Sequence, residues 1–405
     1  MTATRTTDLR TGTTVWEARR LRGPASEPLR RDARTGVLVV GAGVSGALIA
    51  QALAEAGEDV MVIDRRGLAK GATAASTALL QYELDEPMIR LARKRGIEAT
   101  RRIWRRSRLA VAAIGERARR LGIDADIHER CSLYLAGDRL DARDLEREWA
   151  ERKRAGFEVE LLSRRDLKDR FGLSRAAAIL AFGNYEADPR RLALGFLKDA
   201  AARGARLHCP VELAGFESTA RGVTARTREG LTIRARELVL ATGYEMPEDV
   251  PADAHEIVST WAIATRPQPR NLWPDHCLIW EASDPYLYAR ATTDGRIVCG
   301  GEDEDFADVA TRDALLPRKT KALERKLARL MPWVDPRAEF AWTGSFGASR
   351  DGAPSIGRAP GLARVHACLG YGGNGTTFSM MAAQMIAADI GGRPDPDAEL
   401  FAFQR

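Results

Sequence analysis

Residues 41–46 read Gly-Ala-Gly-Val-Ser-Gly, which has the form G-x-G-x-x-G. In this pattern the first glycine permits a tight turn, the second lets the backbone approach a pyrophosphate, and the third lets a helix pack closely on a strand. Free N–H groups at the start of such a helix attract an anionic diphosphate. The pattern therefore predicts a dinucleotide site with five candidate residues, Gly41, Gly43, Val44, Ser45 and Gly46.

A carboxylate follows these glycines at the distance that the same site requires. Asp64 comes directly after the apolar run 60–63, and Arg65 follows it. A carboxylate at this position can accept hydrogen bonds from the ribose of an adenosine. A glycine turn without a ligand remains the alternative, and the pattern by itself does not distinguish FAD from NAD. We add Asp64 and Arg65 to the candidate cofactor residues.

Two later motifs favour FAD. The run 237–240 is strand-like and leads into Ala241-Thr242-Gly243. Near the other end, residues 370–377 read Gly-Tyr-Gly-Gly-Asn-Gly-Thr-Thr at a strand-to-helix junction. The start of this second helix could direct N–H dipoles at the part of a flavin ring where negative charge develops on reduction. A plain helix cap is the alternative. The motifs add the candidates Ala241, Thr242, Gly243, Gly372, Gly373, Asn374, Gly375 and Thr376.

The elements around these motifs predict an alternation of strands and helices. Residues 37–40 predict a strand, 44–56 a helix and 60–63 a second strand, which together form a βαβ unit. The apolar spacing of 86–121 predicts one long arginine-rich helix, and Asp188 and Pro189 are typical of a helix start. Strands are also expected at 132–136, 159–162, 340–346 and 365–369, a hairpin with its turn at Asp294–Gly295, a loop over 347–361, and helices over 141–155, 318–330 and from 377.

Composition excludes several classes of protein. The chain has 405 residues, 45% of them hydrophobic, with 62 Lys and Arg against 56 Asp and Glu. These values are typical of a globular protein with a mixed-sign surface, and the net charge of +6 is too small to indicate a nucleic-acid partner. No apolar run is long enough to span a membrane. No apolar stretch follows the arginine pairs of residues 1–34, so a cytoplasmic location is expected.

The five cysteines are far apart and never form a Cys-x-x-Cys pair. Their spacing argues against a disulfide framework and against a structural zinc site. We therefore expect reduced thiols and no metal.

Taken together, the motifs resemble those of the D-amino-acid oxidase family of flavoproteins, from about Val37 to the C-terminus. The resemblance rests on the 41–46 glycines with Asp64, on residues 71–76, 132–136, 188–189 and 241–243, and on 351–357 and 370–379. It implies noncovalent FAD, with Thr73 and Ser76 along the cofactor and Val211 holding the adenine through its backbone. It also implies an α/β (α+β overall) fold in which a Rossmann-like FAD/NAD(P)-binding domain is interleaved with a mixed-sheet substrate-binding domain.

The resemblance divides the chain into interleaved segments. We expect an N-terminal arm at 1–34, an FAD-binding domain from 35–86, 188–250 and 344–393, a substrate-binding domain from 87–187 and 251–343, and a tail at 394–405.

The substrate residues are predicted from the segment 286–290, Tyr-Leu-Tyr-Ala-Arg. It resembles a Tyr-x-x-Pro-Arg segment in amino-acid-oxidising relatives, although alanine replaces the proline. A guanidinium suits a carboxylate bidentately, and residues two apart on a strand share a face. Arg290, Tyr288 and Tyr286 are therefore candidate substrate-binding residues. Trp280 is a further candidate, as a side chain that lines the same site. An arginine on a surface strand and a tryptophan in the core are the alternatives.

The resemblance implies oxidation of the C–N bond of an amine or amino acid by hydride transfer to the flavin N5, giving an imine that hydrolyses. No acid–base residue is assigned, since the flavin supplies the chemistry. The electron acceptor is O₂ or an electron-transfer partner, and the oligomeric state stays open. The alternatives are an FAD-dependent tRNA-modifying enzyme, a flavin monooxygenase, and a flavin-binding subunit without turnover of its own.

Overall fold

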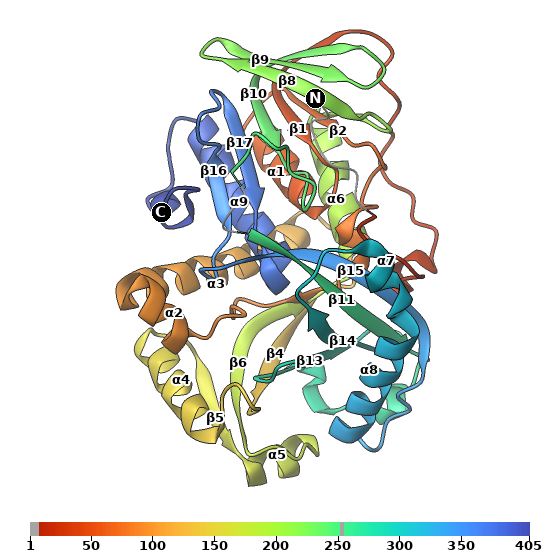
Figure 1. Ribbon diagram of the computed structural model, residues 1–405, viewed down its shortest axis with the longest axis vertical. Coiled ribbons are helices and arrows are strands. Elements are labelled where there is room, and N and C mark those ends of the chain that lie inside the picture. The colour runs from red at the N-terminus through yellow and green to blue at the C-terminus, as the bar shows by residue number, and fades with distance from the viewer. Residues whose placement is uncertain (1–7, 252–254) are drawn as a thin grey trace.

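The computed structural model describes residues 8–251 and 255–405, and it folds into two sheets joined by helices (Figure 1). The first sheet lies at the top of Figure 1 and the second at the bottom. Residues 1–7 of the expected N-terminal arm lie outside the described part.

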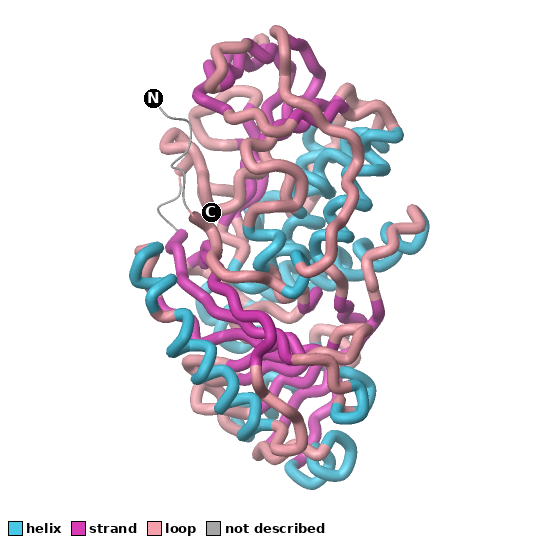
Figure 2. The backbone as a smooth tube through the Cα atoms, turned by 90° about the vertical axis from the view of Figure 1, so that its right-hand side faces the viewer, coloured by secondary structure: helices cyan, strands magenta, loops and turns pink. Residues whose placement is uncertain are grey.

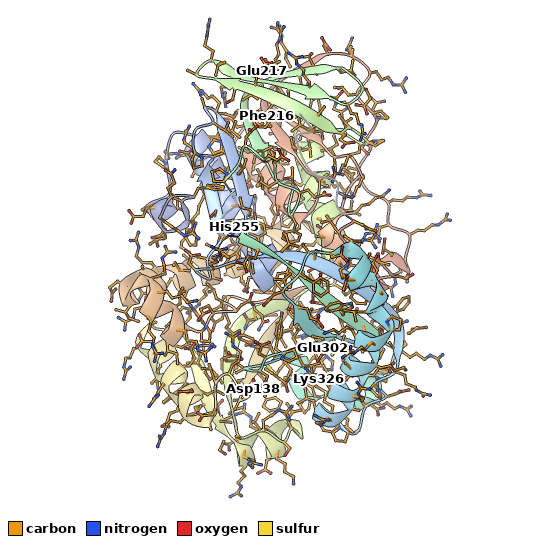
Figure 3. The ribbon with its side chains drawn as sticks, viewed as in Figure 1. Asp138, Phe216, Glu217, His255, Glu302 and Lys326 are labelled. Carbon is orange, nitrogen blue, oxygen red and sulfur yellow. A yellow bond between two sulfur atoms is a disulfide. The ribbon has the colours of Figure 1, made fainter. Side chains whose placement is uncertain are left out.

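The first sheet is mostly parallel and contains eight strands. Its central strands β1, β10 and β2 are parallel, as the βαβ pattern requires, and the β8–β9 hairpin extends from β10. Figure 3 labels Phe216 and Glu217 on that hairpin. The order is β16 (Ser355–Arg358), β17 (Val365–Leu369), β10 (Thr232–Leu240), β1 (Ala33–Val40), β2 (Val60–Ile63) and β7 (Arg206–His208), with β8 (Leu213–Thr219) and β9 (Gly222–Thr227) beside β10.

Helices with apolar contact surfaces cover this sheet. Helix α1 (Val44–Glu55) is buried along nearly its whole length and packs against α6 (Pro189–Ala202) and α9 (Gly375–Ile390). At the start of α6 the Asp188 side chain accepts hydrogen bonds from the N–H groups of Arg190 and Arg191, which is the predicted cap.

The second sheet has nine strands and mixed pairing. The long strand β11 (His255–Thr265) pairs antiparallel with β15 (Ala338–Ser349) and β14 (Ile297–Glu304). Helix α8 (Leu316–Leu330) packs across these strands (Figures 1 and 2). The other members are β13 (Leu287–Ala291), β12 (Leu278–Glu281), β4 (His128–Leu135), β6 (Ala177–Glu186), β3 (Leu79–Leu80) and β5 (Val159–Ser163); helices α4 (Ala142–Arg154), α5 (Arg164–Phe171) and α7 (Val309–Ala314) lie outside the sheet.

Two strands lie in a different sheet from the one that the expected boundaries give. β3 falls within the expected FAD segment 35–86 and the second half of β15 within the expected FAD segment 344–393, yet both pair in the second sheet. The chain therefore crosses between the sheets inside these segments, and residues of both crossings face the space between the sheets.

Three sequence-based expectations are wrong. The single helix expected over 86–121 is two helices, α2 (Met88–Arg95) and α3 (Ile97–Arg120), because Gly96 has φ +79°, which a continuous helix cannot contain. The loop expected over 347–361 contains strand β16, which pairs with β17. Cys131 and Cys277 form a disulfide between β4 and the start of β12, since the parallel pairing brings their Cα atoms within 4.8 Å.

Candidate active site

A large cavity runs between the two sheets and contains about 1840 Å³ of space, counting its open mouth. One end is lined by the glycine turn after β1 and by the residues after β2. The other end is lined by side chains of the second sheet. The N-terminal arm contributes as well, because Leu9 lines the cavity while its carbonyl oxygen accepts a hydrogen bond from the Ser345 N–H at 3.1 Å.

The glycine turn at the first end leaves no room for side chains. Gly41 has φ +111°, and a Cβ there would lie 2.2 Å from the Ala241 carbonyl oxygen. A Cβ on Gly46 would lie only 1.8 Å from the carbonyl oxygen of Gly41. The Val44 N–H donates to the Thr73 hydroxyl at 2.9 Å. The lack of side chains thus lets the backbone of the turn and the start of α1 border the cavity, as a diphosphate requires.

Asp64 organises the turn that follows β2. Its Oδ2 accepts a hydrogen bond from the Ala42 N–H at 2.8 Å, and its Oδ1 accepts from the N–H groups of Arg66 and Gly67 at 2.7 and 2.9 Å. The carboxylate therefore ties the glycine turn to the turn after β2 while it still lines the cavity. The Val211 N–H donates to the Asp64 carbonyl oxygen, so this backbone donor is used within the protein.

Basic side chains at this end of the cavity are paired with carboxylates. Both arginines after Asp64 form ion pairs with Glu245, which is only 4% exposed. Arg66 donates to the two carboxylate oxygens of Glu245 at 2.5 and 2.7 Å, and this pairing raises the pKa of Arg66. Arg65 also lies 3.5 Å from Glu212.

The start of α9 forms the middle of the cavity wall. The 3₁₀ turn Gly372–Asn374 precedes this helix, and the Asn374 side chain donates to the carbonyl oxygens of Gln81 and Glu83, at 3.1 and 2.9 Å. The Gly373 N–H donates to Oδ2 of Asp85 at 2.7 Å. Desolvation raises the pKa of Asp85, although this hydrogen bond opposes the effect.

Aromatic side chains of the second sheet form the other end of the cavity. Tyr286, Tyr288 and Trp280 all line it. The Tyr286 and Tyr288 rings are 5.8 Å apart, and Trp280 stacks on Tyr134 at 3.8 Å. Burial raises the pKa of both tyrosines, which therefore remain protonated at neutral pH.

A pair of glycines makes room for these tyrosines. A Cβ on Gly300 would lie 2.3 Å from the Tyr288 hydroxyl, and one on Gly301, whose φ is +129°, would lie 2.1 Å from the Tyr286 carbonyl oxygen. Beyond them, Asp303 accepts a hydrogen bond from the Tyr286 hydroxyl at 2.6 Å. Burial raises the pKa of Asp303 to about 6.

The structure corrects the expectation for Arg290. Its guanidinium is 2% exposed and donates to the carbonyl oxygens of Thr77 and Ala187, at 2.6 and 2.7 Å. It lies 3.5 Å from Glu186 and is stacked on Trp16 of the N-terminal arm at 5.0 Å. Arg290 lines a separate small pocket and does not line the main cavity. Its hydrogen-bonding groups are used by the protein, so it is not positioned to bind a substrate carboxylate in the cavity.

Comparison with known proteins decides the family. The model of the DAO family, described as FAD dependent oxidoreductase, matches residues 36–389. The chain belongs to this family.

Individual members of the DAO family are similar at low identity. Gamma-glutamylputrescine oxidoreductase of Escherichia coli is 24% identical over 90% of this chain and 84% of its own length. Glycine oxidase of Bacillus licheniformis is 24% identical over 92% of this chain and 97% of its own. The crystal structure of glycine oxidase from Geobacillus kaustophilus superposes with a TM-score of 0.75 at 21% identity, covering 92% of this chain and 99% of that one.

The protein is thus an FAD-dependent oxidoreductase of the DAO family, and the cavity fits that cofactor. The glycine turn that a Cβ would fill, the helix starts of α1 and α9, and the length of the cavity from Asp64 to Tyr288 suit a dinucleotide with a flavin ring. The described lining residues include no cysteine or histidine that could attach the flavin covalently, in agreement with noncovalent binding.

Nearly all the predicted cofactor residues line the cavity, and Gly46 lies directly behind it. Sequence reasoning missed several lining residues from separate parts of the chain. The sequence did contain a signal for Asp303. Gly300 and Gly301 precede it, and glycines inside a strand often mark a place where another group approaches the backbone closely. Asp85 and Leu9 had no such signal. The missed lining residues include Leu9, Gln81, Asp85, Tyr244, Thr260 and Tyr371.

No helix within residues 8–251 and 255–405 combines the length and the apolar character that crossing a bilayer requires.

Proposed function

We propose that the C–N bond oxidised by this FAD-dependent oxidoreductase belongs to a small amine or amino acid, and that Trp280, Tyr286 and Tyr288 form its binding site. The observation that carries the proposal is one continuous cavity that joins a dinucleotide turn to an enclosed aromatic wall. An aromatic wall of this kind suits a small organic molecule rather than a polymer.

The chemistry that bound FAD supplies is acceptance of a hydride from the carbon that bears the nitrogen. The residues of this chain bind and orient. The glycines at 41–46 and the start of α1 would hold the diphosphate, and Gly372, Gly373 and Gly375 at the start of α9 would lie beside the ring. Tyr286, Tyr288 and Trp280 exclude water and fix the orientation of the substrate C–H bond.

An anaerobic reduction assay tests the proposal. The holoenzyme is mixed without oxygen with primary amines, N-methyl amino acids, and D- and L-amino acids, and the flavin absorbance near its visible maximum is followed. We expect at least one of these compounds to bleach the flavin. If dithionite bleaches the flavin and none of the compounds does, the proposal is wrong.

The electron acceptor belongs to the same proposal as O₂ or an electron-transfer partner. Oxygen uptake during turnover identifies an oxidase, whereas turnover only with an artificial dye identifies a dehydrogenase. A cytoplasmic location also stays a prediction, and the Cys131–Cys277 disulfide is the observation that weighs against fully reduced thiols.

A further inference from the structure

At the aromatic end of the cavity, where the substrate would bind, no basic residue of the described lining balances the acidic one. Among the described residues that line the cavity, the basic ones are Arg65 and Arg66, and both are paired with Glu245 near Asp64. The lining at the aromatic end contains the acidic Asp85 and no lysine or arginine. A substrate carboxylate enclosed there would find no cation to compensate its desolvation.

The basic side chains just outside this end are held by other groups. Arg290 donates to backbone carbonyl oxygens and faces Glu186. The ammonium group of Lys319 donates to the Glu302 carbonyl oxygen at 2.7 Å and lies 2.6 Å from Glu304. Lys326 forms an ion pair with Glu302, and the two lie side by side in Figure 3. Each of these three cations is thus paired with groups of the protein, and none of them lines the cavity.

Negative charge lies next to the aromatic end of the cavity instead. Asp303 carries the hydrogen bond from Tyr286, and its pKa of about 6 leaves it mostly ionised at neutral pH. Burial raises the pKa of Asp303, of Tyr286 and of Tyr244, and the charge of Asp85 raises all three further, so these groups lie close enough to Asp85 to feel its charge. Of the other groups that face Asp303, Thr260 on β11 and Lys319 on α8 both lower its pKa.

The aromatic walls suit an organic cation. Faces of tyrosine and tryptophan attract alkylammonium groups, and their area buries an alkyl chain. Trp280 is 9% exposed, and its ring N–H has no hydrogen-bond partner within the described part of the chain.

We propose that the substrate is an alkylamine without an α-carboxylate, whose cationic group is attracted by Asp303, through Tyr286, and by Asp85. The inference rests on the proposed function and narrows it to one substrate class. Tyr286 is the residue that touches the ligand, and Asp303 is a positioning residue that acts through it.

Matched substrate pairs test the inference. The holoenzyme is reduced anaerobically with butylamine against norvaline and with putrescine against ornithine, where each pair differs by one carboxyl group. We expect the amine of each pair to reduce the flavin at least about tenfold more efficiently at subsaturating concentration. Equal or better reduction by the amino acids would overturn the inference while the proposed function stood. Reduction by neither class would end both.

Variants of Asp303 and Tyr286 separate the effect of charge on substrate binding from the effect of cavity shape. Asp303→Asn should weaken binding of butylamine about tenfold, measured by its perturbation of the oxidised flavin spectrum, and should reduce the preference for amine over amino acid. Tyr286→Phe, which removes the hydroxyl but keeps the ring, provides a second variant if Asp303→Asn binds too little flavin. Asp305→Asn is the control, because Asp305 is exposed and outside the cavity lining.

The pH dependence gives a second readout. Binding of butylamine should tighten as the pH rises through about 6, since ionised Asp303 attracts the cation and protonated Asp303 does not. In Asp303→Asn this rise should shrink to the part contributed by Asp85. Unchanged affinity and an unchanged pH profile in Asp303→Asn and in Tyr286→Phe would overturn the inference.

Discussion

At the scale of single residues, the cofactor end of the cavity depends on the absence of side chains. Gly46 does not line the cavity, but it holds α1 against the turn that does. The sequence predicts this site well because the requirement is local: three glycines, one strand and one helix lie within a short stretch. Each glycine is needed for contacts with its own close neighbours.

Gly46→Ala should therefore weaken FAD binding about tenfold or more, because the new Cβ would overlap the Gly41 carbonyl oxygen and push α1 from the turn. The flavin content of the purified protein, measured by absorbance, checks this. Gly215→Ala is the matched control, since a Cβ there meets nothing within 4 Å. Equal flavin content in the two variants would contradict the argument.

Asp303, next to the aromatic end of the cavity, makes the stability of the fold depend on pH. The pKa of Asp303 is about 6 in the folded protein against 3.8 for an ordinary aspartate. Because the folded pKa is raised, the folded state binds this proton more tightly. The resulting stability is present below pH 3.8 and is lost as the pH rises through about 6.

Asp303→Asn should consequently be more stable than the natural protein at pH 8, by roughly 3 kcal/mol, and the difference should vanish toward pH 4. Urea unfolding at several pH values measures it, with Asp305→Asn as the control. A variant that is less stable at pH 8 would show that the charge of Asp303 is compensated in the fold.

Asp85, Asp303 and Leu9 could not be predicted as one site, because they are far apart in sequence and only Asp303 has a local signal, the glycine pair before it. For Arg290 a local pattern exists, but it does not reveal the surroundings of the side chain. The alternation of a strand correctly suggests that it shares a face with Tyr286 and Tyr288. Nothing local reveals that Trp16 and the Thr77 carbonyl oxygen close over its guanidinium.

At the scale of elements, a buried ionic network fixes the segment that carries Asp85. Arg152 on α4 is fully buried and donates to Glu148 at 2.7 Å and to Glu83 at 3.1 Å. Glu148 accepts hydrogen bonds from the N–H groups of Met88 and Ile89 at the start of α2. The network thus connects α4 to the chain on both sides of Asp85.

Removal of one partner from such a network leaves buried carboxylates uncompensated. Arg152→Met should lower the free energy of unfolding by about 3–5 kcal/mol, measured by denaturant titration. Arg154→Met on the same helix is the control, because Arg154 is 68% exposed and should change stability by less than about 0.5 kcal/mol. Similar losses in both variants would mean that the network contributes nothing specific.

The disulfide between β4 and β12 is a second element-scale feature that spacing did not predict, because 146 residues separate its cysteines. Under denaturing conditions without reductant, a thiol reagent should react with three cysteines, Cys209, Cys299 and Cys368. After reduction all five should react, and the free energy of unfolding should fall by about 2–4 kcal/mol. Five reactive thiols before reduction would contradict the disulfide.

At the scale of the whole molecule, the cofactor cavity joins the two sheets. Gly41 belongs to the first sheet and Tyr288 to the second, and both line the same space. FAD that binds only the folded protein should therefore stabilise both sheets together. The family pattern predicted two interleaved units from the order of motifs, whereas the position of strands β3 and β15 depends on pairing between distant segments.

Protein from which FAD has been removed should unfold at a lower temperature. FAD at 100 times its dissociation constant should restore about 2.7 kcal/mol of stability. Scanning calorimetry should show the whole transition moving with FAD concentration. Two transitions of which only one moves would indicate that the cofactor stabilises one sheet alone.

The order in which the strands of the first sheet are synthesised determines when the cofactor site can form. β1 and the glycine turn leave the ribosome early, but β17 and the start of α9, which complete the wall of the same cavity, are made more than three hundred residues later. At about 5–20 residues per second, this interval lasts roughly 15–65 s. During translation the nascent chain holds an open half-site that cannot yet enclose the flavin. Capture of FAD is thus a step that follows synthesis of the start of α9.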